Sequence, residues 1–294
     1  MSSGSVVVIV VTHQGRGRTV DRCLDAVRTS GGFDRLVVVD NSGHTDVDTP
    51  PVDDVDLWLP VPNEGYGAAV NRGVDAASRR WGSADHVAVL NDDTRVGPAW
   101  LEPLLAALTA DERVGAVQPK LLVAGSTPPL VNSVGVELDR TGAGTDVGLD
   151  AADGPAWEHG REIELFTGGA VVFSAAFLAA TGGFDERYFL YYEDVDLALR
   201  GGELGWRYRC EPAGTVEHWR GSSSAALGDE LRRLQERNRL WVAFRFASPG
   251  AVGAALWLSI RRLRHEPRRA HATALASGLA GAPRRLVERF RARR

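Results

Sequence analysis

The sequence predicts an α/β protein in which a mostly parallel sheet is covered by helices on both faces. Three uninterrupted apolar runs rich in β-branched residues are typical of fully buried strands, and they occur at residues 6–11, 36–39 and 87–90. Stretches with helical periodicity lie between or after them, at residues 20–27, 68–77 and 101–108. Such alternation is typical of parallel sheets. A chain of 294 residues with 44% hydrophobic residues can bury the core that this architecture needs.

The run at residues 6–11 is expected to be the first strand. It is only six residues long and no basic segment precedes it, so it does not have the pattern of a signal peptide. The two cysteines, Cys23 and Cys210, are far apart and form no C-x-x-C pattern, which predicts neither a disulfide framework nor a thiolate metal site. These features favour a protein of the reducing cytoplasm.

Polar segments follow the predicted strands at the edge where open α/β sheets bind ligands. The candidate residues are Thr12 and His13 after the first strand, Asp40 and Asn41 after the second, and Asn63, Gly65, Gly67 and Asn71 at the start of the next helix. Glycines there would let the backbone approach a ligand, and a helix N-terminus favours phosphate. The spacing is not the dinucleotide fingerprint G-x-G-x-x-G. Taken singly, Asp40 and Gly65 are also ordinary turn residues.

The third strand ends in Asn91-Asp92-Asp93, a run of hard oxygen ligands. Mg²⁺ and Mn²⁺ use few protein carboxylates and complete their shell with water and phosphate oxygens, so the run suits a metal bound to a diphosphate. The alternative is a turn that caps the helix beginning near Pro98.

The second half of the chain is less regular. Residues 125–160 are rich in Gly, Pro, Ser and Asp, which predicts long loops or a mobile flap. Further strands are expected at 171–173 and 206–208, and a long helix at 230–246.

Glu193 and Asp194 open another predicted helix. Acids in a first turn are stabilised by the helix dipole, by about 0.3–1 kcal/mol, and that alone could explain them. The preceding aromatic residues, Tyr188 to Tyr192, are not explained in this way. They could desolvate a carboxylate and raise its pKa towards that of a general base.

The charge is divided unevenly along the chain. Residues 261–294 hold eleven arginines and two glutamates, whereas the first 260 residues hold 23 basic and 36 acidic side chains. An acidic body does not favour nucleic-acid binding. The basic end, next to an apolar segment at 251–260 that is too short to span a bilayer, could meet phosphates or lipid headgroups, or could be a solvated, partly disordered terminus.

The ordered set of motifs resembles family 2 glycosyltransferases of the GT-A fold, and within them the bacterial rhamnosyltransferase and galactofuranosyltransferase branch. The resemblance covers about residues 5–245. The motifs that carry it are Thr12-His13, Asp40-Asn41-Ser42, Asn63-Glu64-Gly65-Tyr66-Gly67, Asn91-Asp92-Asp93, Thr167-Gly168-Gly169, Gly183-Phe184-Asp185 and Glu193-Asp194.

The resemblance implies a GT-A domain at 1–245, with a nucleotide-binding half at 1–125 and an acceptor half at 126–245, followed by a helical, Arg-rich extension at 246–294. It also implies roles for single residues. Asp40 would contact the base, residues 63–73 the nucleotide and diphosphate, and Asp93 the metal. Asn91 stands where many relatives carry Asp, which weakens metal coordination there and leaves open whether Asp92, a candidate donor-binding residue, also contributes to the metal site. Asp194 would be the catalytic base and Glu193 its orienting neighbour. His218 would complete the metal site or touch the diphosphate, although a lone histidine beside an aromatic is often structural.

The activity implied by the resemblance is inverting sugar transfer assisted by Mg²⁺ or Mn²⁺. The donor would be a dTDP- or UDP-sugar carrying rhamnose or galactofuranose, and the acceptor a hydroxyl of a cell-envelope glycan or a polyprenyl-diphosphate-linked glycan. The enzyme would lie in the cytoplasm at the inner face of the membrane, with peripheral contact through its tail and no nucleic-acid partner. Two rival functions are a nucleotidyltransferase, for which the only lysine, Lys120, lies far from the 15–18 loop, and a non-catalytic sugar-nucleotide-binding protein, for which the acid pair would have no use.

Overall fold

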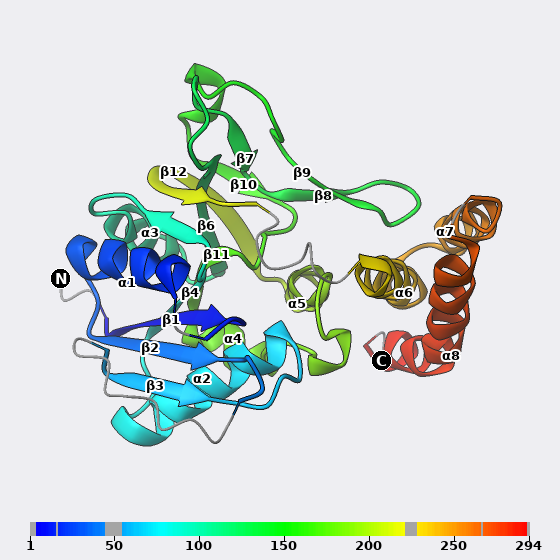
Figure 1. Ribbon diagram of the computed structural model, residues 1–294, viewed down its shortest axis with the longest axis horizontal. Coiled ribbons are helices and arrows are strands. Elements are labelled where there is room, and N and C mark those ends of the chain that lie inside the picture. Colours follow the sequence, from blue (N-terminus) through cyan, green and yellow to red (C-terminus); the bar gives the residue numbers. More distant parts are fainter. Residues whose placement is uncertain (1–3, 16, 45–54, 221–227, 266, 293–294) are drawn as a thin grey trace.

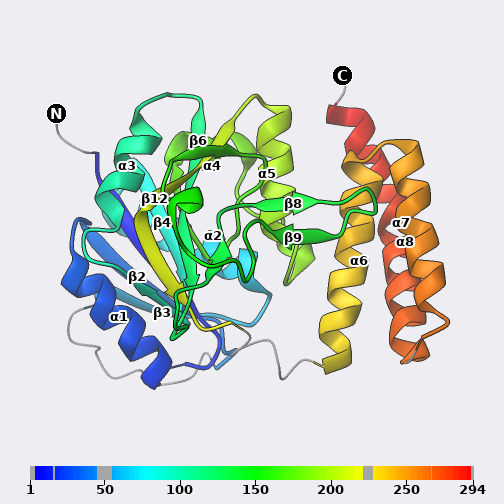
Figure 2. The same cartoon turned by 90° about the horizontal axis from the view of Figure 1, so that it is seen from above.

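The computed structural model describes residues 4–15, 17–44, 55–220, 228–265 and 267–292. A central sheet with strand order β10-β12-β6-β11-β4-β1-β2-β3 crosses the molecule. Helices cover both of its faces, and three C-terminal helices form a separate layer at one side (Figures 1 and 2).

The N-terminal part of the sheet is parallel, as predicted. Its strands are β1 (Val6–Thr12), β2 (Arg35–Asp40), β3 (Leu57–Pro60) and β4 (His86–Asn91). The intervening helices are α1 (Arg18–Ser30), α2 (Tyr66–Trp81) and α3 (Leu101–Thr109). Alternate residues of β1 face two apolar cores, one shared with α2 and the other with α1 and α3. Burial on both faces explains why these strands are continuous valine-rich runs.

The strand register brings the predicted site residues to one edge. Thr12 pairs with Asp40, and Val11 pairs with Asn91, so the carboxyl ends of β2, β1 and β4 lie side by side. Thr94 in the short strand β5 (Thr94–Val96) pairs with His218 at the end of β12 (Arg207–His218). This pairing carries His218 to the same edge from the far end of the chain.

The C-terminal part of the sheet is mixed. Strand β11 (Ala170–Ser174) runs antiparallel to both β4 and β6 (Val114–Val123), whereas β6 and β12 are parallel. Helices α4 (Ala175–Thr181) and α5 (Glu193–Glu203) follow β11, with the 3-10 turn η2 (Glu186–Tyr188) between them. The expected strand at 206–208 is confirmed but is the start of a twelve-residue strand.

Turns and irregular backbone make up most of residues 125–160, as the prediction of long loops requires, but the short strands of this segment were not predicted. The segment contains β7 (Val131–Ser133), a hairpin of β8 (Val136–Leu138) and β9 (Gly144–Asp146), and the 3-10 turn η1 (Pro155–Trp157), followed by β10 (Arg161–Ile163). Each of its strands is three residues long, which is too short for alternation of apolar and polar residues to be recognised in the sequence. The hairpin extends towards the C-terminal helices (Figure 2).

The C-terminal helices are α6 (Gly228–Phe246), α7 (Pro249–Arg262) and α8 (Arg268–Ala292). A solvated, partly disordered terminus is not what the described residues form, because α8 packs along α6 and buries Ala274, Arg285 and Arg289. None of the described helices combines the length and apolar character needed to cross a bilayer.

Candidate active site

A cavity of about 630 Å³ lies at the carboxyl edge of the sheet. It collects side chains from β1, the loops after β2, β3 and β4, the start of α5 and the end of β12. The predicted site residues in its wall are His13, Asn41, Asn63, Gly65, Asp92, Asp93, Glu193, Asp194 and His218. Segments separated by two hundred residues therefore meet in one space.

Thr12 and Asp40 are not in the cavity wall, although their chain neighbours His13 and Asn41 are. The Thr12 hydroxyl donates to the Gly15 carbonyl at 3.2 Å, and Asp40 Oδ1 accepts the Ser42 N–H at 3.1 Å. His13 Nδ1 is 3.2 Å from the Asn41 carbonyl oxygen. These bonds fix two adjacent loops at a strand edge where a nucleotide could bind.

The two glycines before and within α2 allow close packing, and Gly65 also lies in the cavity wall. Gly65 has φ +102°, and a Cβ there would lie 2.2 Å from the Phe189 carbonyl oxygen, which accepts the Tyr66 N–H at 2.7 Å. A Cβ on Gly67 would lie 2.8 Å from Cβ of Phe184. The first turn of α2 is thus docked on residues 184–189, and the N–H groups of Gly65 and Tyr66 are already bonded.

Asn71 also differs from its expected role. It is absent from the cavity wall, and its Nδ2 donates to the Phe184 carbonyl at 2.9 Å and to Glu186 Oε1 at 3.0 Å. Its Oδ1 accepts the Phe184 N–H at 3.0 Å. Asn71 therefore holds the segment before η2 against α2 and has no free amide group for a nucleotide.

Asp92, Asp93 and His218 form the acidic end of the cavity. Burial raises the pKa of Asp92 to about 6. Asp93 Oδ1 lies 3.2 Å from His218 Nε2, while His218 Nδ1 lies 2.7 Å from Asn132 Oδ1. If the ring hydrogen is on Nδ1 and is donated to the Asn132 oxygen, Nε2 presents its lone pair beside Asp93 when a cation binds between them. Asp93 Oδ1 and His218 Nε2 are close enough to bind one cation together. The contact between His218 Nδ1 and Asn132 orients the imidazole, as such contacts do in metal sites.

Protein side chains alone would not complete a metal shell here. The described residues hold no group of three or more His, Cys, Asp or Glu side chains that could bind a metal ion. Asn91 contributes a buried Oδ1 to the cavity wall with no protein hydrogen bond in the described part of the chain. A Mg²⁺ or Mn²⁺ ion would therefore take most of its ligands from water and a bound phosphate, which these ions prefer.

Glu193 and Asp194 form a buried acid pair in the same cavity. Burial, and next the Asp194 charge, raise the pKa of Glu193 to about 8. Burial also raises the pKa of Asp194, although its Oδ2 accepts the Gly168 N–H and its Oδ1 the Val195 N–H, both at 2.8 Å. Oε2 of Glu193 has no hydrogen-bond partner among the described residues. A carboxylate with a raised pKa in a cavity is suited to accept a proton.

The segment before this pair is strained, and α6 holds it. Three non-glycine residues, Phe189, Tyr191 and Tyr192, have φ between +66° and +69°. Asn238, which is fully buried on α6, places its Nδ2 at 2.9 Å from the Tyr188 and Leu190 carbonyl oxygens and 2.7 Å from that of Tyr191. Sequence reasoning did not find Asn238. The sequence does contain a sign of it, because asparagine is a poor helix former and Asn238 stands between Arg237 and Arg239 inside the predicted helix.

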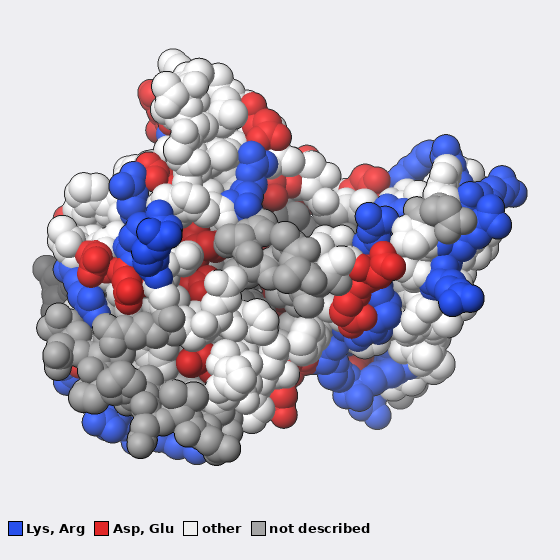
Figure 3. Space-filling view, in the orientation of Figure 1, with Lys and Arg blue, Asp and Glu red and all other residues white. Residues whose placement is uncertain are grey.

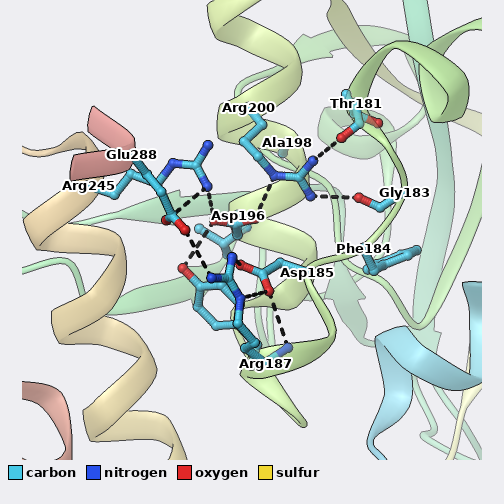
Figure 4. A network of polar contacts seen from close by, with 12 residues as sticks. Thr181, Gly183, Phe184, Asp185, Arg187, Asp196, Ala198, Arg200, Arg245 and Glu288 are labelled. Carbon is cyan, nitrogen blue, oxygen red and sulfur yellow. Dashed lines mark hydrogen bonds and ion pairs between the residues drawn. The ribbon is translucent and has the colours of Figure 1, made fainter. Parts of the chain in front are cut away.

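An ion-pair network joins the same segment to α8 (Figure 4). Asp196, fully buried on α5, accepts from Arg200 at 2.7 Å and from Arg245 at 3.3 Å. Arg285 of α8 donates to Asp185 at 2.7 Å. Burial alone would raise the pKa of Asp185, but the hydrogen bonds and charges of Arg187 and Arg285 outweigh burial and lower this pKa to about 2. The C-terminal helices are thus bonded to the helix that presents Asp194.

Residues 7–130 match the family model described as glycosyl transferase family 2. The chain is 29% identical over 246 residues to N-acetylglucosaminyl-diphospho-decaprenol L-rhamnosyltransferase of Mycobacterium tuberculosis, covering 74% of this chain and 78% of that protein. It is 30% identical over 190 residues to pre-mycofactocin glycosyltransferase of the same organism, covering 63% of this chain and 37% of that protein.

Two solved structures share the fold. GalNAc-T7 with UDP, GalNAc and Mn²⁺ has a TM-score of 0.66 at 13% identity over 98% of this chain, which spans 57% of that chain. The mannosyltransferase PcManGT from Pyrobaculum calidifontis, in complex with GDP-Man and Mn²⁺, has a TM-score of 0.52 at 16% identity and covers 98% and 85% of the two chains. The sheet with the site at its carboxyl edge is the GT-A fold of these structures, and the match of residues 7–130 together with the rhamnosyltransferase relative supports a family 2 glycosyltransferase.

Proposed function

We propose that this enzyme is an inverting, metal-dependent glycosyltransferase that moves rhamnose or galactofuranose from a dTDP- or UDP-sugar to a hydroxyl of a lipid-linked or cell-envelope glycan. The observation that carries the proposal is the meeting of the Asp93–His218 pair and the buried Glu193–Asp194 pair in one cavity. The rhamnosyltransferase relative supports the choice of sugar and of a diphospho-polyprenol acceptor, because its name states both.

Asp93 and His218 would hold the Mg²⁺ or Mn²⁺ ion. When bound, such an ion neutralises the charge that develops on a departing nucleoside diphosphate. Both structural neighbours hold Mn²⁺ together with a nucleotide or a nucleotide sugar, which supports this role. His13, Asn41 and Asn63 would line the nucleotide at the neighbouring strand ends, with Asp40 beside Asn41 in the chain.

Asp194 would accept the proton of the attacking acceptor hydroxyl. Burial and the neighbouring Asp194 charge raise the pKa of Glu193, which favours its protonated form and allows Asp194 to ionise without a second charge beside it. The Gly168 and Val195 N–H groups orient the Asp194 carboxylate. A base separate from the leaving-group site favours single displacement, and hence inversion of the anomeric configuration, by analogy with inverting glycosidases.

The same reasoning extends to the division of the chain and its location. We assign donor binding to residues 1–125, acceptor binding to 126–245, and support of the acceptor side to 246–294, with the enzyme working at the cytoplasmic face of the membrane. A nucleotidyltransferase is disfavoured because Lys120, the chain's only lysine, is buried and paired with Asp153 at 2.8 Å, and does not line the cavity.

Calorimetric titration with UDP, dTDP and GDP, with Mn²⁺ and again with EDTA, tests the proposal. We expect one nucleotide to bind at micromolar concentration with metal and much more weakly without it, and the Asp93→Asn variant to lose the metal-dependent part. A matched control is Asp153→Asn, an acid outside the cavity. If no nucleotide binds in the presence of metal, the donor site is wrongly assigned. If nucleotide binds but no candidate acceptor is glycosylated, the protein is a binding module.

A further inference from the structure

The orientation of Asp194 depends on backbone groups. Lys and Arg side chains gather over the C-terminal helices, on the right of Figure 3, and none in the described part of the chain pairs with Asp194. Its carboxylate instead accepts the N–H groups of Gly168 and Val195, each at 2.8 Å. The Val195 N–H belongs to α5 itself, so among the described residues the Gly168 N–H ties the carboxylate to another element. The direction of this N–H therefore influences where the proposed base points.

Gly168 needs contacts with other elements to hold its direction. It lies in the turn at 167–169 before β11, where two successive glycines give the backbone wide conformational freedom. On one side of it the Thr167 N–H donates to Gln118 Oε1 at 2.9 Å, and on the other the Gly169 carbonyl accepts the Asn91 N–H at 2.9 Å. The carbonyl of Gly168 itself accepts the Tyr66 hydroxyl at 2.6 Å.

Tyr66 reaches this turn from the N-terminal part of the chain. It is the first residue of α2, directly after Gly65, and lies in the cavity wall. Its N–H donates to the Phe189 carbonyl at 2.7 Å, which fixes the start of the helix. A Cβ added to Gly168 would lie 3.4 Å from Tyr66 Cε1 and 3.4 Å from Asp194 Cβ. The tyrosine ring and the aspartate therefore flank the glycine closely.

The hydroxyl of Tyr66 is kept in its donor form. Burial raises the pKa of Tyr66 well above its usual value, and the charges of Glu193 and Asp194 raise it further, followed by those of Asp93 and Asp92. The hydroxyl therefore keeps its proton throughout the pH range in which carboxylates titrate. It can donate to the Gly168 carbonyl whether or not the proposed base is ionised.

We propose that Tyr66 is a positioning residue for Asp194 and acts through the backbone of Gly168. This inference rests on the proposed function, in which Asp194 is the base, and adds a residue of α2 to the groups that orient it. Tyr66 takes no part in the proton transfer itself. Its hydroxyl holds the Gly168 carbonyl, and the Gly168 N–H then holds the Asp194 carboxylate in one direction.

Tyr66→Phe removes only the hydroxyl, and Tyr208→Phe is its matched control. Tyr208 also donates its hydroxyl to a backbone carbonyl, that of Ala198 at 2.6 Å, but it lies outside the cavity wall. Phenylalanine fills nearly the same space as tyrosine, so both variants should fold. Both should also melt at a similarly lower temperature than the wild type, since each loses one hydrogen bond to a backbone carbonyl.

NMR titration of the side-chain carboxyl carbons separates the two variants without requiring activity. The signals of the Glu193–Asp194 pair are assigned by comparison with Asp194→Asn. We expect the pKa of Asp194 to rise in Tyr66→Phe and to stay at the wild-type value in Tyr208→Phe. The physical reason is that a loosened Gly168 N–H stabilises the carboxylate less.

Kinetics with dTDP-rhamnose and octyl N-acetylglucosaminide give the second readout. We expect kcat of Tyr66→Phe to fall about tenfold or more, because the base is no longer held in one direction, and the acidic limb of its pH profile to move to higher pH. The affinity for dTDP with Mn²⁺ should stay within twofold of the wild type. Tyr208→Phe should keep both quantities within twofold.

The proposal is refuted if Tyr66→Phe, shown to be folded, leaves either the titration of the acid pair or kcat at the wild-type value. It is also refuted if the affinity for dTDP falls together with kcat, because Tyr66 would then contact the donor. If the titration moves in Tyr66→Phe alone but the wild type transfers no sugar, the link from Tyr66 to Asp194 is supported and the proposed function is wrong.

Discussion

Replacing Asn238 by alanine removes the side chain that holds the segment before the proposed base. Its Nδ2 carries two hydrogens and lies within 2.9 Å of three backbone carbonyls, from Tyr188, Leu190 and Tyr191. Asn238 itself is not part of the cavity wall and would not touch the acceptor. The substitution therefore separates the geometry of the segment from its chemistry.

The size of the effect follows from two opposing quantities. A buried polar group left without a partner costs about 1–3 kcal/mol, so losing two amide hydrogens costs on the order of 2–6 kcal/mol. The segment also contains three positive-φ residues, and each such conformation stores about 1–3 kcal/mol that relaxation would release. We expect the segment to relax, which limits the loss in the free energy of unfolding to about 2–3 kcal/mol.

Relaxation moves α5 and with it Asp194, since Glu193 directly follows the strained residues. A displacement of about 1 Å at a catalytic group can lower the rate about 100-fold. We therefore expect kcat of Asn238→Ala to fall by about two orders of magnitude while nucleotide affinity stays within threefold. Urea unfolding, calorimetry with nucleotide and Mn²⁺, and steady-state kinetics measure the three quantities.

Asn238→Asp is the companion variant. It keeps the shape of the side chain but replaces the Nδ2 donor by a carboxylate oxygen, which would face three backbone carbonyl oxygens. It should lower kcat at least as much as alanine does. The reasoning is refuted if Asn238→Ala, shown to be folded, retains kcat within threefold of the wild type. It is also refuted if the aspartate variant is as active as the asparagine enzyme.

The remaining predictions concern the cavity itself. Asp194→Asn should reduce transfer by a factor of 10² to 10⁴ and leave nucleotide affinity nearly unchanged, so retained turnover would remove Asp194 as the base. Glu193 is stabilised in its protonated form, so its contribution to stability is lost as the pH rises from about 4.5 to about 8; Glu193→Gln should flatten this decline in urea unfolding measured at pH 5, 7 and 9. Gly65→Ala should destabilise the protein by at least about 1 kcal/mol, because its Cβ would meet the Phe189 carbonyl, and an unchanged melting temperature would contradict this contact.

Much of the fold could be predicted from local pattern. The valine-rich runs gave β1, β2 and β4 because strands buried on both faces must be apolar throughout. The acids after β4 and at the start of α5 were predicted because acidic residues that directly follow a strand or begin a helix can be recognised in the sequence. Their meeting in one cavity depends on the pairing of β4 with β11, and the arrival of His218 depends on the pairing of β5 with β12; no local signal reports either.

Other features depend on contacts between distant segments. Gly65 was expected beside a ligand, but the Phe189 backbone occupies that space. Asn71 was expected at the nucleotide, but it holds Phe184, more than a hundred residues away. The arginines of α8 appeared as a charged tail because sequence shows charge and not partners, and Asp185 and Glu288 became visible only in three dimensions.

The hold of α6 and α8 on the segment before α5 has a consequence for synthesis of the protein. The strands that form the donor edge are complete by residue 91, whereas Asn238 and Arg285 are made much later. The proposed metal pair, which needs His218, and the support of the segment before α5 are therefore both completed only late in synthesis. A chain that ends before α6 would lack the residues that hold the proposed base in place.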